Sequence, residues 1–117
     1  MKRGSIHRDG VCLVPTVWRA DNPVTRLRGL LGRPPLRGSA QEALLLVPCN
    51  SVHTFWMRYA LDLVFLDADE RVLGWVEGLR PWRAKTWLRA KYTLELAAGG
   101  LGTLRPARGE KWSWQPV

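Results

Sequence analysis

The stretch PCNSVHTFWMRYALDLVFLD, residues 48–67, decides both the fold and the candidate site. Its second half, LDLVFL at residues 61–66, is apolar except for Asp62. Short apolar runs with β-branched and aromatic side chains are typical of buried strands. The run therefore predicts a buried strand. A carboxylate inside it is costly unless it is hydrogen-bonded or paired, so Asp62 is expected to have a specific partner.

Three further side chains in this stretch, Cys49, His53 and Met57, recur every four residues. A spacing of four places side chains on one face of either a helix or a strand. Val, Thr, Phe and Trp favour strands, so we expect residues 52–57 to be extended. The thiol, imidazole and thioether are then predicted to lie near one another, with His53 reaching a polar partner.

One amphipathic helix is predicted at residues 23–31. Asn22 is a favourable N-cap, and Pro23 suits the first helical position. Apolar side chains recur at helical spacing through the segment, and Gly32 is well placed to end it in a left-handed conformation. We expect this helix to pack across an open edge or end of a sheet.

Short strands account for most of the remaining sequence. Apolar or alternating runs between turn residues predict strands at residues 11–18, 43–47, 52–57, 61–66, 71–76, 91–96 and 110–114. A hairpin joins the fourth and fifth of these, and a weak helical turn is expected at residues 97–104. Many short strands with one helix favour a mainly β (β-rich α+β) fold, either a β-sandwich or a partly open barrel, over a parallel α/β sheet.

The chain length of 117 residues suits one hydrophobic core. We predict a single domain at residues 10–117 and a frayed tail at residues 1–9. No apolar run is long enough for a membrane span, and the N-terminus lacks the apolar core of a signal peptide. A cytoplasmic location is therefore expected, where Cys12 and Cys49 would be reduced thiols.

The formal net charge is +8 and is unevenly distributed. Residues 26–37 and 80–91 are two basic groups without any acid. The candidate anion-binding residues are Arg28, Arg33, Arg37, Arg83 and Arg89. A basic surface attracts nucleic acid, anionic lipid or acidic protein. We favour a solvated surface over such a site, and predict nucleic-acid binding that is weak and nonspecific at most.

Four segments in order resemble one known family. They are RLRGLLGRPPL at residues 26–36, the 48–67 stretch, RPWRA at residues 80–84 and YTLELAAG at residues 92–99. The chain resembles DUF192, also called UPF0127, over about residues 14–115. Its members are small bacterial and archaeal proteins without an established biochemical role. The resemblance implies a compact, β-rich single domain and no activity, and many members carry an export signal that this sequence lacks.

We interpret the protein as a noncatalytic binding or accessory module with a small pocket around His53, Met57 and Asp62. The candidate ligand-binding residues are Cys49, His53, Thr54, Met57, Asp62, Trp82 and Glu95. The sequence has no phosphate loop, no dinucleotide-binding glycine pattern and no serine elbow, so a nonenzymatic role is favoured. The same polar residues could instead brace the core, with Asp62 accepting hydrogen bonds from backbone donors at a strand end.

Two alternatives stay open. The first is a nucleic-acid or anion binder that uses residues 26–37 and 80–91 together with Trp82 and Trp87, because exposed tryptophan beside arginine can stack on bases. The second uses Cys49 and His53, either as nucleophile and base of an enzyme or as part of a copper or zinc site. Structural zinc sites take four ligands and the central stretch offers fewer, so neither a bound metal nor a cofactor is expected.

Overall fold

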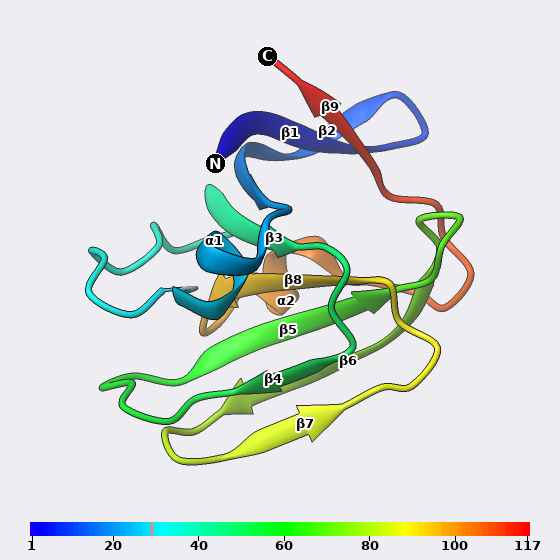
Figure 1. Cartoon of the computed structure of the whole chain (residues 1–117). Helices are drawn as coiled ribbons and strands as arrows, with labels where there is room; N and C mark the ends of the chain where they lie inside the picture. The colour runs from blue at the N-terminus through cyan, green and yellow to red at the C-terminus, as the bar shows by residue number, and fades with distance from the viewer. Residues whose placement is uncertain (29) are drawn as a thin grey trace.

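A curved mixed sheet forms the body of the protein (Figure 1). The computed structural model describes residues 1–28 and 30–117, apart from the side chains of Val24, Leu27 and Arg28. Its elements in chain order are β1 (Lys2–Arg8), β2 (Val11–Ala20), α1 (Pro23–Arg28), β3 (Glu42–Leu46), β4 (Ser51–His53), β5 (Leu61–Leu66), β6 (Val72–Leu79), β7 (Ala84–Thr86), β8 (Tyr92–Ala97), α2 (Gly100–Leu104) and β9 (Ser113–Pro116). Within the described residues, the large sheet has the strand order β6-β5-β8-β3-β2-β1-β9, and β4 pairs with β7.

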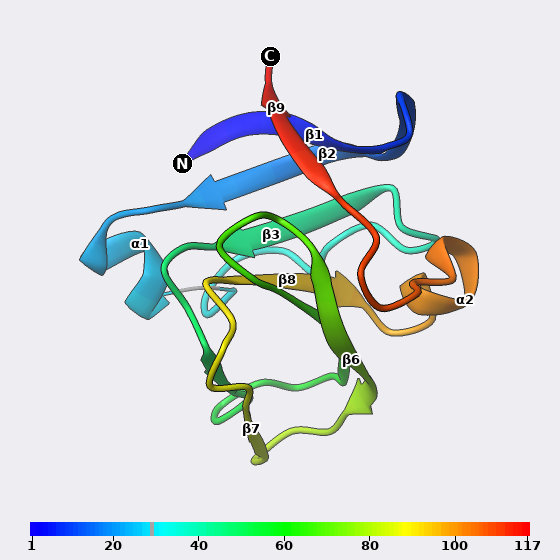
Figure 2. The same cartoon turned by 90° about the vertical axis from the view of Figure 1, so that its right-hand side faces the viewer.

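Neighbouring strands of the large sheet run antiparallel except β2 and β3, which are parallel. Parallel neighbours need a crossover connection, and this one contains α1. The sheet curls so that the segment before β9 reaches the start of β6, where the Val72 N–H donates to the Glu110 carbonyl at 2.9 Å (Figure 2). Because β6 and β9 remain the two ends of the strand order, the sheet is not closed into a barrel. The mainly β fold class and the β5–β6 hairpin are confirmed.

The first strand corrects the prediction of a frayed tail at residues 1–9. β1 pairs antiparallel with both β2 and β9 and thus lies inside the sheet. Ile6 is buried in the core, and a Cβ at Gly4 would lie 2.3 Å from the Gln115 carbonyl oxygen. With one strongly apolar side chain in a basic, polar segment, the composition gave no strand signal.

Both helices are short, and they lie on opposite sides of the sheet (Figure 2). The start of α1 is confirmed, because the Thr25 N–H donates to the Asn22 Oδ1 at 2.9 Å. The helix ends at Arg28, earlier than predicted, and Gly29 lies outside the described residues. The predicted weak turn contains α2. None of the described helices combines the length and apolar composition needed to cross a membrane.

Apolar side chains are buried on both faces of the sheet. One face carries Val64, Leu66, Leu94, Leu96 and Trp112 and packs against Leu101 and Leu104 of α2, and we call it the α2 face. The other face carries Leu44, Leu46, Leu61, Leu63 and Phe65 and packs against Leu30 after α1, and we call it the α1 face. Alternation along each strand sorts the side chains between the two faces.

The prediction that residues 52–57 are extended is wrong beyond His53, where β4 ends. The Met57 N–H donates to the Thr54 carbonyl at 3.2 Å, and Trp56 has a positive φ of 69°. The chain turns here because the buried Thr54 is bonded to the backbone of residues 80–83. Strand propensity does not register this long-range contact.

Candidate functional site

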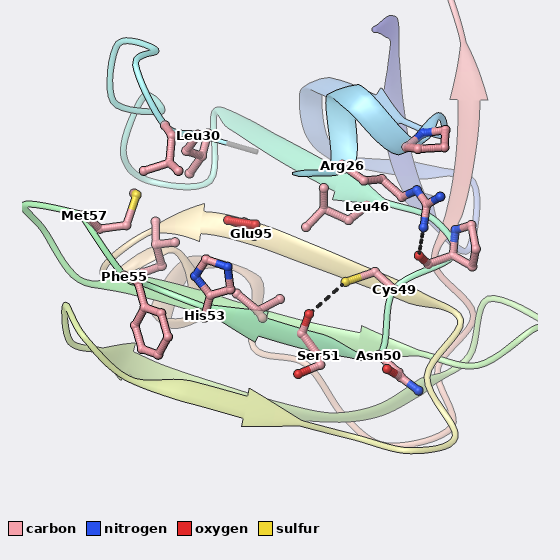
Figure 3. A pocket seen from close by; sticks show the side chains of 15 residues that line it. Arg26, Leu30, Leu46, Cys49, Asn50, Ser51, His53, Phe55, Met57 and Glu95 are labelled. Carbon is pink, nitrogen blue, oxygen red and sulfur yellow. Dashed lines mark hydrogen bonds between the residues drawn. The ribbon is translucent and has the colours of Figure 1, made fainter. Parts of the chain in front are cut away.

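A cavity of about 580 Å³ opens on the α1 face of the sheet (Figure 3). Its polar lining residues are Arg26, Cys49, Asn50, Ser51, His53 and Glu95. Its larger apolar lining residues include Leu30, Leu46, Val52, Phe55, Met57 and Leu61. Ligand sites in proteins are commonly clefts of this volume with mostly apolar walls and a few polar groups. We call it the Glu95 cavity.

Glu95 forms the polar floor of this cavity, and Figure 3 shows it on β8 between the walls. Its side chain is only 5% exposed. Alternation in β8 sends Leu94 and Leu96 to the α2 face and Glu95 to the α1 face. Its direct neighbours across the sheet are Leu44 and Leu63, which surround the carboxyl group with apolar side chains.

The Glu95 carboxyl group is buried without a partner among the described residues. Burial raises the pKa of Glu95 from 4.5 to about 7, because the charged form loses its hydration. Among the described residues, no hydrogen bond or ion pair reaches this carboxyl group. A buried ionisable group that titrates near neutral pH inside a cavity is a candidate functional residue.

Two more polar atoms near the cavity are buried without a partner in the described structure: Arg26 Nε and the Tyr59 hydroxyl. Arg26 lines the cavity and donates from Nη1 to the Pro48 carbonyl at 3.1 Å. The pKa of Tyr59 is raised by desolvation and, to a smaller extent, by the negative charge of Glu95, which places the two groups close together. Most buried polar groups in proteins are hydrogen-bonded, so these orphaned groups call for an explanation.

Sequence reasoning missed Arg26 and Tyr59 as members of the site. Arg26 belongs to a basic group and Tyr59 to the segment before β5, and no spacing of chemical groups marks either residue as part of a site. The fold alone brings Arg26 to the cavity wall and Tyr59 close to Glu95. Their buried polar atoms without partners distinguish them in the described structure, whereas their sequence spacing does not.

Cys49, His53 and Met57, predicted to lie near one another, line the same cavity (Figure 3). The Cys49 thiol donates to the Ser51 carbonyl at 3.3 Å, and both cysteines of the chain are free. The His53 ring stacks on Phe55 with centroids 4.8 Å apart. In the described structure its ring makes no hydrogen bond, so the predicted polar partner of His53 is wrong.

Asp62 does not belong to the cavity, which corrects its place in the predicted pocket. Its Oδ1 accepts the Gly78 N–H at 2.8 Å, and its Oδ2 accepts the N–H groups of Gly99 and Leu101 at 3.0 and 3.1 Å. Alternation in β5 places Asp62 with Val64 on the α2 face, opposite to Glu95. These hydrogen bonds agree with the alternative prediction, in which Asp62 braces the core by accepting hydrogen bonds from backbone donors.

Thr54 and Trp82 lie beside the cavity without lining it. The fully buried Thr54 hydroxyl donates to the Arg80 carbonyl and accepts the Arg83 N–H at 3.0 Å. It thereby joins the loop after β4 to the loop before β7. The exposed Trp82 ring stacks on Phe55, a residue of the cavity wall, at 5.7 Å between centroids.

The candidate anion-binding arginines come from two segments, one at the end of α1 and in the loop that follows it, and one around β7. Arg37 is engaged by Glu42, with Nε 3.9 Å from Oε1, and by the Thr16 hydroxyl at 3.2 Å. Arg33 lines a second, smaller cavity of about 240 Å³. Arg83 and Arg89 are exposed, and the Arg28 side chain lies outside the described structure.

The family model DUF192, described as "Uncharacterized ACR", matches residues 5–114 of the chain. The chain belongs to the DUF192 family. A UPF0127 protein from Pyrococcus horikoshii is 33% identical over 97 residues, which cover 81% of this chain and 84% of that protein. Another from Pyrococcus abyssi is 31% identical over 101 residues, covering 81% and 82%. The resemblance predicted from four sequence segments is therefore confirmed.

A solved structure supports the DUF192 fold. The crystal structure of a protein of unknown function from Novosphingobium aromaticivorans superimposes with a TM-score of 0.79 at 18% identity. The match covers 96% of this chain and 84% of that one. At this identity the likeness concerns the fold alone.

Proposed function

We propose that this DUF192 protein is a noncatalytic binding module whose ligand is a small organic molecule held in the Glu95 cavity. One observation carries the proposal: Glu95 is a buried carboxyl group, without a partner among the described residues, that faces a cavity large enough for a ligand. Burying a polar group without hydrogen bonds costs free energy. A ligand that bonds to Glu95 would offset that cost, and binding would then stabilise the folded protein.

The shape and composition of the walls support binding of an organic molecule. Leu30, Leu46 and Leu61 supply apolar surface, while Arg26 and His53 supply polar groups around it. This combination allows the apolar part of a ligand to leave water and fixes its orientation through a few hydrogen bonds. An inorganic ion alone would leave the apolar walls without a partner.

The alternative of a Cys49–His53 enzyme receives less support from the geometry. A nucleophilic thiol needs a base within hydrogen-bond reach. The Cys49 thiol donates to the Ser51 carbonyl instead, and His53 stacks on Phe55. Among the described residues, no group of three His, Cys, Asp or Glu side chains is arranged to hold a metal ion, so the soft-metal alternative lacks a ligand set as well.

A thermal-shift screen of small organic acids, amines and alcohols, combined with native mass spectrometry of freshly purified protein, tests the proposal. A molecule that binds only the folded state raises the unfolding temperature. Met57→Trp places a large ring at the cavity wall and is expected to abolish the stabilisation. Leu88→Trp introduces the same ring at an exposed position outside the cavity and is the matched control. Equal responses of the two variants, or no stabilising compound and no retained molecule, would contradict the proposal.

A further inference from the structure

We propose that the ligand of the Glu95 cavity is an amphipathic anion, with an apolar body and a carboxylate group, and that Glu95 binds it in the protonated form. This inference rests on the proposed function and names the class of its ligand. It joins three features: the charges around the cavity, the orphaned donors and the apolar walls.

The charges around the cavity favour an anion. Among the described residues, the ionisable groups that face this region are Arg26, Cys49, His53, Tyr59 and Glu95. Only the guanidinium of Arg26 carries a charge that persists throughout the physiological pH range. A ligand carboxylate is attracted by Arg26, whereas an ammonium group is repelled by it. The net charge of +8 on the chain adds a long-range field of the same sign.

The orphaned groups on and beside the cavity wall are all able to donate hydrogen bonds. Arg26 Nε and the Tyr59 hydroxyl are buried without partners, and a protonated Glu95 offers a third donor. A carboxylate has two oxygens with several lone pairs, and its hydrogen bonds to charged donors are strong. A carboxylate ligand therefore fits a site in which donors lack acceptors.

The protonation state of Glu95 decides whether a carboxylate can approach. An ionised Glu95 would repel a second carboxylate, whereas a neutral one can donate a hydrogen bond to it. Burial holds the pKa of Glu95 at about 7, so the neutral form is well populated at physiological pH. A bound carboxylate favours that neutral form further, and binding is accompanied by proton uptake.

The remaining walls define the other half of the ligand. Leu30, Leu46 and Leu61 supply apolar surface to the cavity wall. Met57 and Phe55 extend this surface along the loop after β4 (Figure 3). Such a surface contributes binding free energy in proportion to the apolar area that leaves water. A short alkyl or aryl chain attached to the carboxylate meets this requirement.

Isothermal titration calorimetry with hexanoate, hexylammonium and 1-hexanol tests the inference, because the three probes share one apolar chain and differ in the polar group. Hexanoate is expected to bind most tightly. Its affinity should fall about tenfold between about pH 6 and about pH 8, since the protonated fraction of a group that titrates near 7 falls by that factor. Repeating the titration in buffers of different ionisation enthalpy should reveal the proton uptake.

Variants separate Glu95 from the other groups that titrate or carry charge nearby. Glu95→Gln keeps a donor without a titrating proton, and should bind hexanoate with little dependence on pH. His53→Asn should leave the pH dependence in place. Arg26→Met should lower the affinity for hexanoate by more than tenfold, because it removes a charge-assisted hydrogen bond. Its affinity for 1-hexanol should change little. A pH dependence that persists in Glu95→Gln and disappears in His53→Asn would overturn the role of Glu95.

The probes also distinguish this inference from the proposed function on which it rests. Tighter binding of hexylammonium or of 1-hexanol than of hexanoate would show that the ligand is not an anion, and would leave the proposed binding cavity in place. If none of the three probes binds and the thermal-shift screen finds no stabilising compound, both the anionic ligand and the proposed binding function are contradicted.

Discussion

Two carboxyl groups are buried in neighbouring strands of one sheet, and their surroundings are opposite. Asp62 on β5 is 1% exposed and accepts hydrogen bonds from three backbone N–H groups. Glu95 on β8 is 5% exposed and accepts none from the described residues. In the sequence both are single acids within apolar runs. Burial therefore does not tell a structural acid from a functional one, whereas the supply of donors does.

Strand alternation and the position of free backbone N–H groups explain the difference. Asp62 faces the turn from β8 into α2, where the N–H groups of Gly99 and Leu101 have no strand partner and are bonded by the carboxylate instead. Glu95 lies inside the sheet between β3 and β5, where backbone N–H groups are used in the strand pairing. Its side chain lines the cavity, and none of the described backbone N–H groups donates to its carboxyl group.

The largest expected effect is the pH dependence that Glu95 imposes on stability. Its pKa is about 7 in the folded protein against 4.5 in the unfolded chain, so the folded state holds the proton more tightly. Its contribution is fully present below pH 4.5 and is lost as the pH rises through about 7, by about 3 kcal/mol in total. Urea unfolding at several pH values should show this loss in the parent protein and not in Glu95→Gln.

The exposed Glu77 on β6 offers a matched control for that experiment, as Glu77→Gln should retain the pH dependence of the parent. Parent and Glu95→Gln curves that run parallel across the range would show that Glu95 is solvated or paired, and the contrast with Asp62 would disappear.

Removal of the hydrogen-bonded Asp62 carboxylate should lower the stability of the protein. Asp62→Ala leaves backbone donors of the β8–α2 turn without an acceptor, at an expected cost of about 1–3 kcal/mol in the free energy of unfolding. Asp62→Asn keeps one acceptor oxygen, so its free energy of unfolding should fall by less than that of Asp62→Ala. The measurement is denaturant unfolding near neutral pH, and an Asp62→Ala variant as stable as the parent would contradict the structural role.

Thr54 extends the class of satisfied groups. Thr54→Val removes the hydroxyl that joins the loops at residues 80–83 and 54–57, and should destabilise the protein by about 1–2 kcal/mol. Tryptophan fluorescence should change as well, because the rings of Trp56 and Trp82 contact each other across these loops with centroids 4.7 Å apart. Thr54→Ser retains the hydroxyl and is the control; if it loses as much stability as Thr54→Val, packing rather than hydrogen bonding holds the loops.

The smallest effect is expected at Tyr59, the orphaned neighbour of Glu95. Its hydroxyl is buried without a hydrogen bond in the described structure, so Tyr59→Phe should leave the free energy of unfolding unchanged or raise it by up to about 1 kcal/mol. The same denaturant experiment measures it. A loss as large as that of Thr54→Val would reveal a bonding partner and place Tyr59 among the satisfied groups.

The sequence predicted the elements whose signals are local. The β5 strand is an unbroken apolar run, and the start of α1 has a capping asparagine followed by proline. β1 escaped notice because it is stabilised by pairing on both sides rather than by its own composition. The turn after His53 depends on Thr54, whose partners lie about thirty residues further along the chain.

The part of the candidate site that lies within one stretch of sequence was predictable. Cys49, His53 and Met57 lie in one stretch, and the structure brings them to one cavity. The sequence placed both Asp62 and Glu95 among the candidate ligand-binding residues, because the choice between the two faces of the sheet depends on strand pairing and not on the acids themselves. Arg26 reaches the cavity through the packing of α1, which a sequence pattern does not show.

The most direct test of the central claim is the titration of the Glu95 side-chain carboxyl carbon by nuclear magnetic resonance, assigned with the Glu95→Gln variant. The account predicts a midpoint at about 7 in the free protein, with a further rise when hexanoate is bound. A midpoint near 4.5 would show that the carboxyl group is solvated or already paired, and would contradict the account.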